Sequence, residues 1–323
     1  MSQTPMRGQP QGFALMAALW LVVLVGATGY ELSVRSRTRR LAVANALETV
    51  QANAAAEAGL ETVRGALEQR LLQPLNTRVR GIVAAPIDPL GDLTFLRADT
   101  LHLGDERSHA IAYDAGARLQ INRATEDDVR RFLIAVPLDA SVADGVAQCI
   151  LDWRDPDTLR RARGAERADY LRAGARVLPA DGDFRHVEEL RDVSGVTPEL
   201  YTRIAPYVSV LGSGQINLNS APRLVLRSLP GLGDEAVDVI IRAQQSERPI
   251  RSLEELTPRL SSGARASLLN ATPELMSRVA FDTREVIVEA DGWMSGSPVR
   301  THAVAVYERN GDALSTTWRR VGR

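Results

Sequence analysis

FALMAALWLVVLVGATGYELSVRSRTRRLAVANALETVQANAAAEAGLETVRGALEQRLL, residues 13–72, is a long segment with two contrasting parts. Its first 17 residues carry no charge, which is at the short end of the length that a membrane-spanning helix needs. The remainder is rich in alanine, leucine and glutamate, which favour helix, and no proline interrupts it before Pro74. We therefore predict one continuous helix of about 60 residues, about 90 Å long.

Such a helix does not fit inside a globular domain. Its first third is apolar on all sides and the rest is amphipathic, so it requires lipid around one end and protein along the remainder. The small residues Ala42, Ala46, Asn53 and Ala56 predict a narrow face that another helix approaches closely. A cleaved secretory signal peptide is the competing interpretation, but its apolar core would end at a small-x-small cleavage site instead of continuing as helix.

The residues before the helix form a short polar leader that contains one basic side chain, Arg7, and ends at Gly12. Phe13 then opens the apolar run. This arrangement resembles the type IV prepilin class, in which a membrane peptidase cuts after the glycine and methylates the new amino terminus. Most pilins carry glutamate at the fifth mature residue, where this chain has Ala17. In lacking that acid the chain is similar to the K-type minor pseudopilin of type II secretion; an ordinary signal anchor is the alternative.

Beyond the helix the hydrophobic pattern changes period. Strands are predicted at 108–116, 285–290, 299–307 and 313–321, a helical block at 119–278, and turns at Asp291-Gly292 and Asn310-Gly311. We predict an α+β fold in which the long N-terminal transmembrane helix packs on a small antiparallel sheet, with a large all-helical insertion between its strands. The K-type resemblance covers essentially the whole chain and implies the same pilin-like architecture.

The predicted segments follow one another in chain order. They are a prepilin leader at 1–12, the transmembrane and amphipathic helix at 13–73, the first part of the pilin-like body at 74–118, a helical insertion with repeated helix-hairpin-helix-like units at 119–280, and C-terminal strands that complete the sheet at 281–323.

Within the insertion two stretches are similar enough to be distant copies. LQINRATEDDVRRFLIAV starts at Leu119 and GQINLNSAPRLVLRSLPGLG starts at Gly214, and each continues from Gln-Ile-Asn into a polar capping region and an amphipathic helix. VEELRDVSGVTPELYTRIAPYV, from Val187, is a weaker third candidate.

LPGLGDEAVDVIIRA, from Leu229, has the pattern of a helix-hairpin-helix unit, with Gly231 and Gly233 supplying the positive-φ backbone of a tight hairpin. In DNA-binding versions the hairpin amides and the positive end of the next helix hold a phosphate. A membrane-anchored DNA-binding protein of a competence or DNA-uptake system is therefore the alternative function. Asp234 and Glu235 argue against it, because carboxylates at this position repel a phosphate. We expect the unit to serve packing.

ILDWRDPDTLRRARGAERADYL, from Ile150, contains four candidate metal ligands: Asp152, Asp155, Asp157 and Glu166. Carboxylates this close together are hard oxygen ligands that suit Ca²⁺, although the residue order of an EF-hand is absent. The spacing alone leaves a second interpretation open, a solvated acidic loop paired with neighbouring arginines. The stretch also resembles the K-type pattern of a DW-x-D-x-D run followed by GAE, whose members bind calcium in the helical domain. That resemblance implies calcium as the cofactor and these four carboxylates as its ligands.

Composition and motifs argue against several other classes of function. The 39 basic residues, all arginine, nearly balance 40 acidic ones, so the chain has no net basic field to attract a nucleic acid. The four histidines lack metal-type spacing, and no P-loop, nucleophile elbow or dinucleotide fingerprint occurs. We therefore expect no enzyme activity and neither a nucleic acid nor a small-molecule substrate as partner. The single cysteine, Cys149, cannot form an internal disulfide.

These observations together predict a structural minor pseudopilin of the type II protein secretion machinery, a single-pass protein of the inner membrane with most of its chain in the periplasm. Its expected partners are the prepilin peptidase, inner-membrane lipid, and other minor pseudopilins in a heteromeric tip complex. Two features predict that it caps or initiates the pseudopilus tip. Ala17 leaves no buried acid that a subunit above must neutralise, and so large an insertion would clash with a neighbour stacked overhead.

Processing provides the first test. We expect a prepilin peptidase to cut between Gly12 and Phe13, because the short basic leader ends there and the apolar run starts immediately afterwards. N-terminal sequencing of the membrane-extracted protein should begin at Phe13. An intact Met1, or a cut beyond the apolar run, would contradict the prediction.

Overall fold

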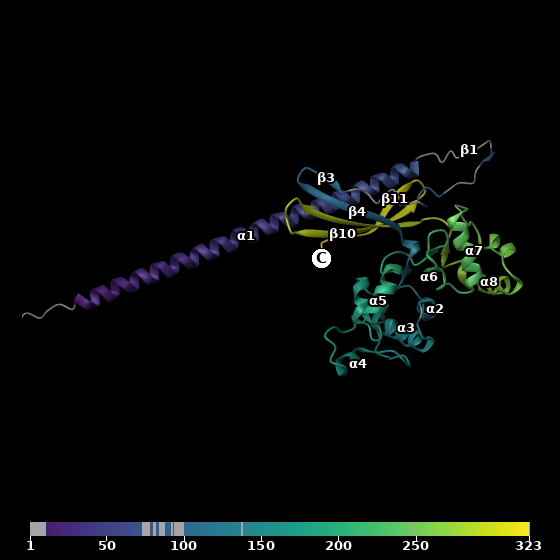
Figure 1. The fold of residues 1–323 in the computed structure, drawn as a ribbon, viewed down its shortest axis with the longest axis horizontal. Coiled ribbons are helices and arrows are strands. Elements are labelled where there is room, and N and C mark those ends of the chain that lie inside the picture. Colours follow the sequence, from purple (N-terminus) through teal and green to yellow (C-terminus); the bar gives the residue numbers. More distant parts are fainter. Residues whose placement is uncertain are drawn as a thin grey trace, which may run out of the picture.

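Helix α1 (Gln11–Leu72) is one uninterrupted element of 62 residues, as the sequence predicts. The computed structural model describes residues 11–72, 78–79, 82–83, 88–91, 93, 100–136, 138–246 and 248–322. Residues 1–10 of the predicted leader, and most of the predicted body segment between 73 and 99, lie outside the described residues. The first half of α1 extends away from the rest of the molecule (Figure 1), and its large apolar side chains are exposed, Trp20 at 70%.

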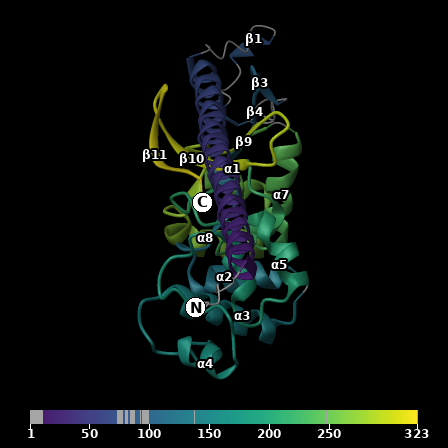
Figure 2. The same cartoon turned by 90° about the vertical axis from the view of Figure 1, so that its left-hand side faces the viewer.

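The second half of α1 packs on an antiparallel sheet (Figures 1 and 2). In order across the sheet, its strands are β11 (Ala313–Val321), β10 (Arg300–Asn310), β9 (Glu285–Met294), β4 (Glu106–Asp114) and β3 (Leu101–Leu103). A separate short ladder joins β1 (Arg78–Val79) to β2 (Ile82–Val83). The hairpin predicted at Asn310-Gly311 is present one residue later, because Asn310 pairs with Ala313 and leaves Gly311 and Asp312 as the loop.

The helix and the sheet share one hydrophobic core. Leu60 and Leu67 of α1 are fully buried against alternate residues of the strands, among them Val286, Val288 and Tyr307. Alternation places one side of each strand toward the helix, and leaves the opposite side for the insertion described below. This arrangement confirms the predicted α+β class.

Two glycines bring the backbones of α1 and the sheet close together. A methyl group added to Gly292 would lie 2.2 Å from the carbonyl oxygen of Ala52 and 2.3 Å from the backbone nitrogen of Ala56. At Gly59 it would lie 2.2 Å from Oγ of Ser108. The predicted turn at Asp291-Gly292 is therefore wrong: both residues lie inside β9, where glycine permits the close approach of another backbone.

Of the four small residues predicted to form a narrow face on α1, Ala56 packs within the molecule and Asn53 is partly buried, whereas Ala42 and Ala46 are exposed. Ala56 is completely buried against the sheet, so the prediction that it faces a second helix is wrong. The exposed side of α1 instead carries larger apolar residues: Val43, Leu47 and Val50 are 69%, 59% and 63% exposed. Their spacing places them on one face of the helix, which we name the α1 stripe.

The insertion leaves the sheet at the end of β4 and rejoins it at the start of β9. Asp114, at the end of β4, pairs with Val286, near the start of β9. The two connections between the sheet and the insertion therefore lie side by side. The buried carboxylate of Asp114 accepts hydrogen bonds from the backbone of Gly116 (2.8 Å) and from side chains of the insertion and its return, Asn217 (2.7 Å), Ser220 (2.7 Å) and Thr283 (3.2 Å). The pKa of Asp114 is raised above its usual range, because the effect of burial outweighs the lowering effect of these hydrogen bonds. This carboxylate therefore ties the sheet to the insertion.

The insertion consists of helices, short 3₁₀ turns and two small ladders. Its α-helices are α2 (Glu126–Ala135), α3 (Ala140–Arg154), α4 (Arg167–Arg172), α5 (Pro198–Ile204), α6 (Arg223–Leu226), α7 (Asp234–Gln245) and α8 (Ser262–Leu275). Its 3₁₀ turns are η2 (Ala115–Ala117), η3 (Val187–Asp192), η4 (Ala205–Tyr207), η5 (Leu253–Glu255) and η6 (Thr257–Arg259). Its strands are β5 (Leu119–Gln120), β6 (Val208–Ser209), β7 (Ile216–Asn217) and β8 (Val279–Ala280). Strands of two residues have no periodicity, which is why the sequence did not reveal them.

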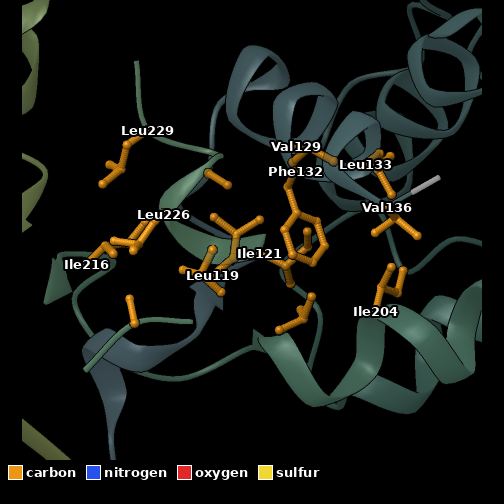
Figure 3. Packing of buried hydrophobic residues seen from close by; sticks show 14 of the residues in the cluster. Leu119, Ile121, Val129, Phe132, Leu133, Val136, Ile204, Ile216, Leu226 and Leu229 are labelled. Carbon is orange, nitrogen blue, oxygen red and sulfur yellow. The ribbon is translucent and has the colours of Figure 1, made fainter. Parts of the chain in front are cut away.

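Two copies of one supersecondary unit form this insertion. In the first, β5 pairs in parallel with β6, and in the second β7 pairs in parallel with β8. Asn122 exchanges two hydrogen bonds of 2.9 Å with the backbone of Phe184, and Asn219 exchanges two of 2.8 Å with the backbone of Ile250. Two helices lie between strand and clamp in both copies, α2 and α3 in the first and α6 and α7 in the second, and the first copy adds the short helix α4. Side chains of both copies, such as those of Leu119 in the first and Leu226 in the second, meet in one core (Figure 3).

The two copies align two residues away from the register that the sequence match suggests. The shared Gln-Ile-Asn aligns Gln120 with Gln215. In the ladders, however, Gln120 is the second residue of β5 and pairs with Ser209, and the equivalent second residue of β7 is Asn217, which pairs with Ala280. The side-chain oxygen of Gln120 accepts from the backbone N–H of Asn122 (2.6 Å), and that of Asn217 accepts from the backbone N–H of Asn219 (3.0 Å). An amide side chain at this position is therefore the shared requirement, and either glutamine or asparagine meets it.

The segment from Val187 is not a third copy. It is the second half of the first copy, and VEEL at Val187 corresponds to LEEL at Leu253. In both places the second glutamate accepts a hydrogen bond from a backbone N–H four residues earlier, Glu189 from Arg185 and Glu255 from Arg251. The similarity noticed in the sequence is real, but it belongs to this later half of the unit.

The backbone contact at Gly292 has a direct test. Gly292→Ala should destabilise the protein by about 1–3 kcal/mol, because the new methyl group meets backbone atoms of α1 that cannot rotate away. A lower midpoint of thermal unfolding, measured by circular dichroism on the full chain in detergent, checks this.

Gly65→Ala is the matched control on α1. No described residue lies within 4 Å of the added methyl group, and alanine favours a helix over glycine by about 1 kcal/mol. This variant should keep or raise the midpoint. Equal midpoints for Gly292→Ala and the unaltered protein would contradict the contact.

Candidate functional site

Three of the four predicted metal ligands, Asp155, Asp157 and Glu166, lie on a segment that only the first copy of the repeated unit possesses, whereas Asp152 lies in the last turn of α3. In that copy residues 155–183 separate α3 from the clamped Phe184, whereas in the second copy residues 246–249 suffice to connect α7 to Ile250. Residues 155–183, which we name the acidic loop, are therefore an addition to the repeated unit, because the second copy joins its helix to its clamp without them.

Three aromatic side chains hold the two ends of this loop together. Trp153, in the last turn of α3, stacks on Phe184 with ring centroids 6.2 Å apart and meets the edge of Tyr170 at 5.3 Å. The hydroxyl oxygen of Tyr170 accepts a hydrogen bond from the backbone N–H of Ser194 (2.8 Å). Because Trp153 and Phe184 belong to the core of the insertion, the loop starts and ends on rigid elements.

Asp152 is fully buried, and its carboxylate is held by Arg161. The guanidinium of Arg161 donates to Oδ1 of Asp152 (2.5 Å), and the backbone N–H of Arg161 donates to Oδ2 (3.2 Å). Gly164 passes so close that an added methyl group would lie 1.9 Å from Oδ2 of Asp152. Asp152 therefore fixes the path of the loop through its contacts with Arg161 and Gly164. Only glycine fits at position 164.

The other three predicted ligands converge. One carboxylate oxygen from each of Asp155, Asp157 and Glu166 lies within 4.8 Å of the others. Glu166 is 4% exposed, and neither of its carboxylate oxygens has a hydrogen-bond partner among the residues that the structure describes. Oδ1 of Asp155 is likewise buried without a partner there. Arg161 also reaches this group, because its guanidinium donates to Oδ2 of Asp155 (2.5 Å).

The electrostatics of this group favour a bound cation. Burial, and then repulsion from Asp152, Asp155 and Asp157, raises the pKa of Glu166. Arg161 neutralises part of the charge on two of the aspartates, and no arginine contacts Glu166 among the described residues. Three carboxylates supply up to six hard oxygen ligands, and Ca²⁺ takes six to eight at about 2.4 Å. The unpartnered oxygens and this donor set therefore fit a calcium ion.

Two further residues shape this site. Arg161 was expected only under the alternative interpretation, as one of three arginines (with Arg154 and Arg160) that pair with the acidic loop, and Gly164 was not assigned a role. Arg161 bridges Asp152 and Asp155, and Gly164 leaves room for the carboxylate of Asp152. The run Gly164-Ala165-Glu166 was noticed for its acid, whereas the glycine is the residue that the packing requires. Nothing in the local spacing distinguishes Arg161 from Arg160 beside it.

The predicted hairpin lies between α6 and α7, and its glycines have different roles. Gly231 has a φ of +69°, as predicted, but Gly233 has a φ of −70° and serves as the N-cap of α7, so the expected positive φ at Gly233 is wrong. The first turn of α7 carries Asp234, which forms an ion pair with Arg227. Its neighbour Glu235 accepts hydrogen bonds from the backbone and hydroxyl of Ser261 (2.7 and 2.6 Å).

These contacts determine what the hairpin offers to a ligand. A phosphate bound at the N-terminus of α7 would meet two carboxylates that are already engaged in packing and ion pairing. A methyl group at Gly231 would lie 2.4 Å from Cβ of Ala271 on α8. The close approach at this glycine therefore packs the hairpin against α8 within the second copy.

The predicted processing residues, Gly12 and Phe13, lie within the first turn of α1. The helix that follows is long and apolar enough to cross a membrane, with a mean hydropathy of 1.8 over its most apolar window. None of the residues in that window is buried by the rest of the described chain. The described part of the chain therefore carries one helix with the properties of a membrane anchor.

The sequence matches one family of known proteins. Residues 104–213 match the family described as type II secretion system (T2SS), protein K. The chain is 26% identical over 188 residues to the type II secretion system protein K of Dickeya chrysanthemi, covering 56% of this chain and 48% of that protein. It is 28% identical over 235 residues to that of Klebsiella pneumoniae, covering 67% and 68%. The match thus spans about half the length of the first relative.

The fold also has a solved counterpart. A chain from the crystal structure of the GspK-GspI-GspJ complex of the enterotoxigenic Escherichia coli Type 2 Secretion System superposes with a TM-score of 0.58 and 16% identity, covering 90% of this chain and 99% of that one. At that identity the likeness establishes a shared fold. The long helix, the antiparallel sheet and the helical insertion therefore form one known architecture.

Proposed function

We infer that this chain belongs to the type II secretion system protein K family, whose description residues 104–213 match, and that it is a structural minor pseudopilin of the protein secretion machinery. One observation carries the proposal: α1 is a single helix that is apolar and exposed in its first half and packed on a sheet in its second. Such a helix anchors a body beside a membrane and offers its free surface to neighbours. The role is structural, with no catalytic step.

The proposed location is the inner membrane, crossed once by α1, with the sheet and the insertion in the periplasm. The uncharged run that follows Gly12, and the helical backbone at Gly12 and Phe13, support a prepilin peptidase site between these two residues. Cleavage there would leave Phe13 as the first residue of the anchor.

The proposed partners are other minor pseudopilins in a heteromeric complex. The solved counterpart comes from a complex of three such proteins, GspK, GspI and GspJ. The α1 stripe (Val43, Leu47 and Val50) supports a similar assembly, because large apolar side chains gathered on one exposed helix face mark a surface where another protein binds. A neighbouring amphipathic helix fits such a stripe.

Two features support a position at the tip of the pseudopilus. Ala17 places no acid in the apolar part of α1, so no subunit above is needed to neutralise one. The insertion widens the end of the molecule away from the free half of α1 (Figure 1), where a subunit stacked above would have to fit. We therefore propose that this chain caps or initiates the pseudopilus.

Crosslinking tests this position. Cysteines introduced one at a time at Val43, Leu47 and Val50 should crosslink to other minor pseudopilins in membranes, in a complex that holds one copy of this chain. A cysteine at Ala52, which is fully buried against the sheet, is the matched control and should not react. The native Cys149 is buried and provides little background. Repeated self-crosslinks along a fibre would show an interior, polymerising subunit instead.

Calcium is the cofactor that we propose for the acidic loop, held by Asp155, Asp157 and Glu166, with Asp152 shaping the loop from beneath. Support comes from the unpartnered buried oxygens and from the raised pKa of Glu166. When bound, the ion would join residues on both sides of the loop. The expected gain is stability of the insertion.

Removal of the metal tests this proposal. A ligand that binds only the folded state adds about 2.7 kcal/mol at a hundredfold excess over its Kd, so a chelator should lower the melting temperature of the unaltered protein. Glu166→Gln should melt at the same temperature with and without chelator, and above the chelated parent, because the repulsion at Glu166 is gone.

Asp144→Asn is the control for this experiment. Asp144 is a half-exposed acid on α3 outside the loop, and this variant should respond to chelator as the parent does. Identical responses from Glu166→Gln and Asp144→Asn would remove the metal proposal.

A further inference from the structure

Four arginines follow the apolar run of α1 within six positions: Arg35, Arg37, Arg39 and Arg40. All four side chains are exposed. Arg35 forms an ion pair with Glu31, the one acidic residue nearby, and Arg40 donates a hydrogen bond to Oγ of Ser36 (3.0 Å). Within the described chain Arg37 and Arg39 contact no carboxylate. Residues 31–40 therefore carry a net charge of +3, four arginines less one glutamate, and in the described part of the chain Glu31 is the one acid paired with any of these arginines.

The height of these arginines along α1 matches the edge of a membrane. A hydrocarbon core about 30 Å thick corresponds to about 20 helical residues, so a span that begins at Phe13 ends near Leu32. Arg35 then lies about 5 Å and Arg40 about 12 Å beyond the hydrocarbon, which is the depth of the polar headgroups. Tyr30, 74% exposed, stands at the boundary where interfacial aromatic residues are common.

The arginines also point in different directions around the helix. At about 100° per residue, Arg39 lies about 40° from Arg35, Arg40 about 140° and Arg37 about 200°. A neighbouring protein helix would contact one stripe of α1 and leave the others unpaired. Lipid headgroups surround a single helix and reach every side of it.

We propose that Arg35, Arg37, Arg39 and Arg40, which we name the arginine collar, bind the phosphates of anionic phospholipid headgroups in the leaflet where α1 leaves the membrane. This inference rests on the proposed membrane anchoring. Guanidinium groups suit phosphate, since they present several donors in a fixed plane. Their long aliphatic stems lie along the helix while the charged ends reach the headgroups.

The collar also explains how a short apolar run spans a membrane. The uncharged stretch from Phe13 to Tyr30 is 18 residues, which as a helix is a few ångströms shorter than a typical hydrocarbon core. Charges that hold headgroups close to the end of this stretch thin the bilayer locally, or fix the depth of α1 in the bilayer. The collar therefore sets the height at which the body stands above the lipid.

The test uses the full chain in nanodiscs made of equal parts of phosphatidylcholine and phosphatidylglycerol. Native mass spectrometry of the released protein counts the lipids that it retains. The retained lipids should contain phosphatidylglycerol and phosphatidylcholine in a ratio of about 5:1, against 1:1 in the disc, which is the effect expected of one basic residue at an anionic surface, and added salt should reduce this ratio. The R35Q/R37Q/R39Q/R40Q variant should retain the two lipids in the proportion of the disc.

The matched control carries the same change of charge on exposed arginines of the insertion, R172Q/R176Q/R185Q/R203Q, and should keep the enrichment. Equal lipid retention by both variants, or no enrichment in the parent, would overturn the proposal. A further outcome would also overturn the proposal. If the parent protein bound inorganic phosphate in discs of phosphatidylcholine alone, and the same phosphate concentration abolished the lipid enrichment in the mixed discs, the collar would be a general anion site.

A separate measurement distinguishes this inference from the proposed function. Alkaline carbonate leaves a spanning protein in the membrane pellet. A parent protein that pellets but shows no lipid enrichment would refute the collar alone. A parent protein that is released into the supernatant would refute the membrane anchoring and the collar with it.

Discussion

The contact between α1 and β9 at Gly292 is the constraint on which the body of this protein depends. The carbonyl oxygen of Ala52 and the backbone nitrogen of Ala56 lie so near this glycine that no side chain fits between them. Small residues on both partners lower the helix onto the sheet, and larger ones such as Leu60 and Leu67 fill the space where the two diverge. Because α1 is continuous, its position on the sheet also fixes the direction in which the membrane-facing half emerges.

Sequence reasoning predicted the features that have strong periodicity. The long helix, the final strands and the hairpin near Gly311 were placed within a few residues, because alternation and helix-forming composition extend over many positions. Gly292 was misread, since a glycine that admits a neighbouring backbone has the same local signature as one in a turn. The contact that explains it lies more than 200 residues away in the chain, at Ala52.

The candidate metal site was predicted in part for a similar reason. Closely spaced acids are visible in the sequence, and three of the four predicted carboxylates do converge. What the sequence could not show is that Asp152 turns to Arg161, because that depends on how the loop folds back over α3. The repeated unit gives the loop its context. The second copy closes without such a loop, so the acidic segment was accommodated without altering the scaffold.

The adjacent connections of the insertion at Asp114 and Val286 have a mechanical consequence. A force that draws α1 along its axis out of lipid reaches the body through the helix–sheet interface, which it loads in shear. The insertion is attached at one end of two neighbouring strands. It therefore lies outside the route by which the force passes from α1 to the sheet, and tension in the helix does not stretch it. A domain placed in this way can grow, bind a metal or hold a partner without weakening the part of the molecule that bears the load.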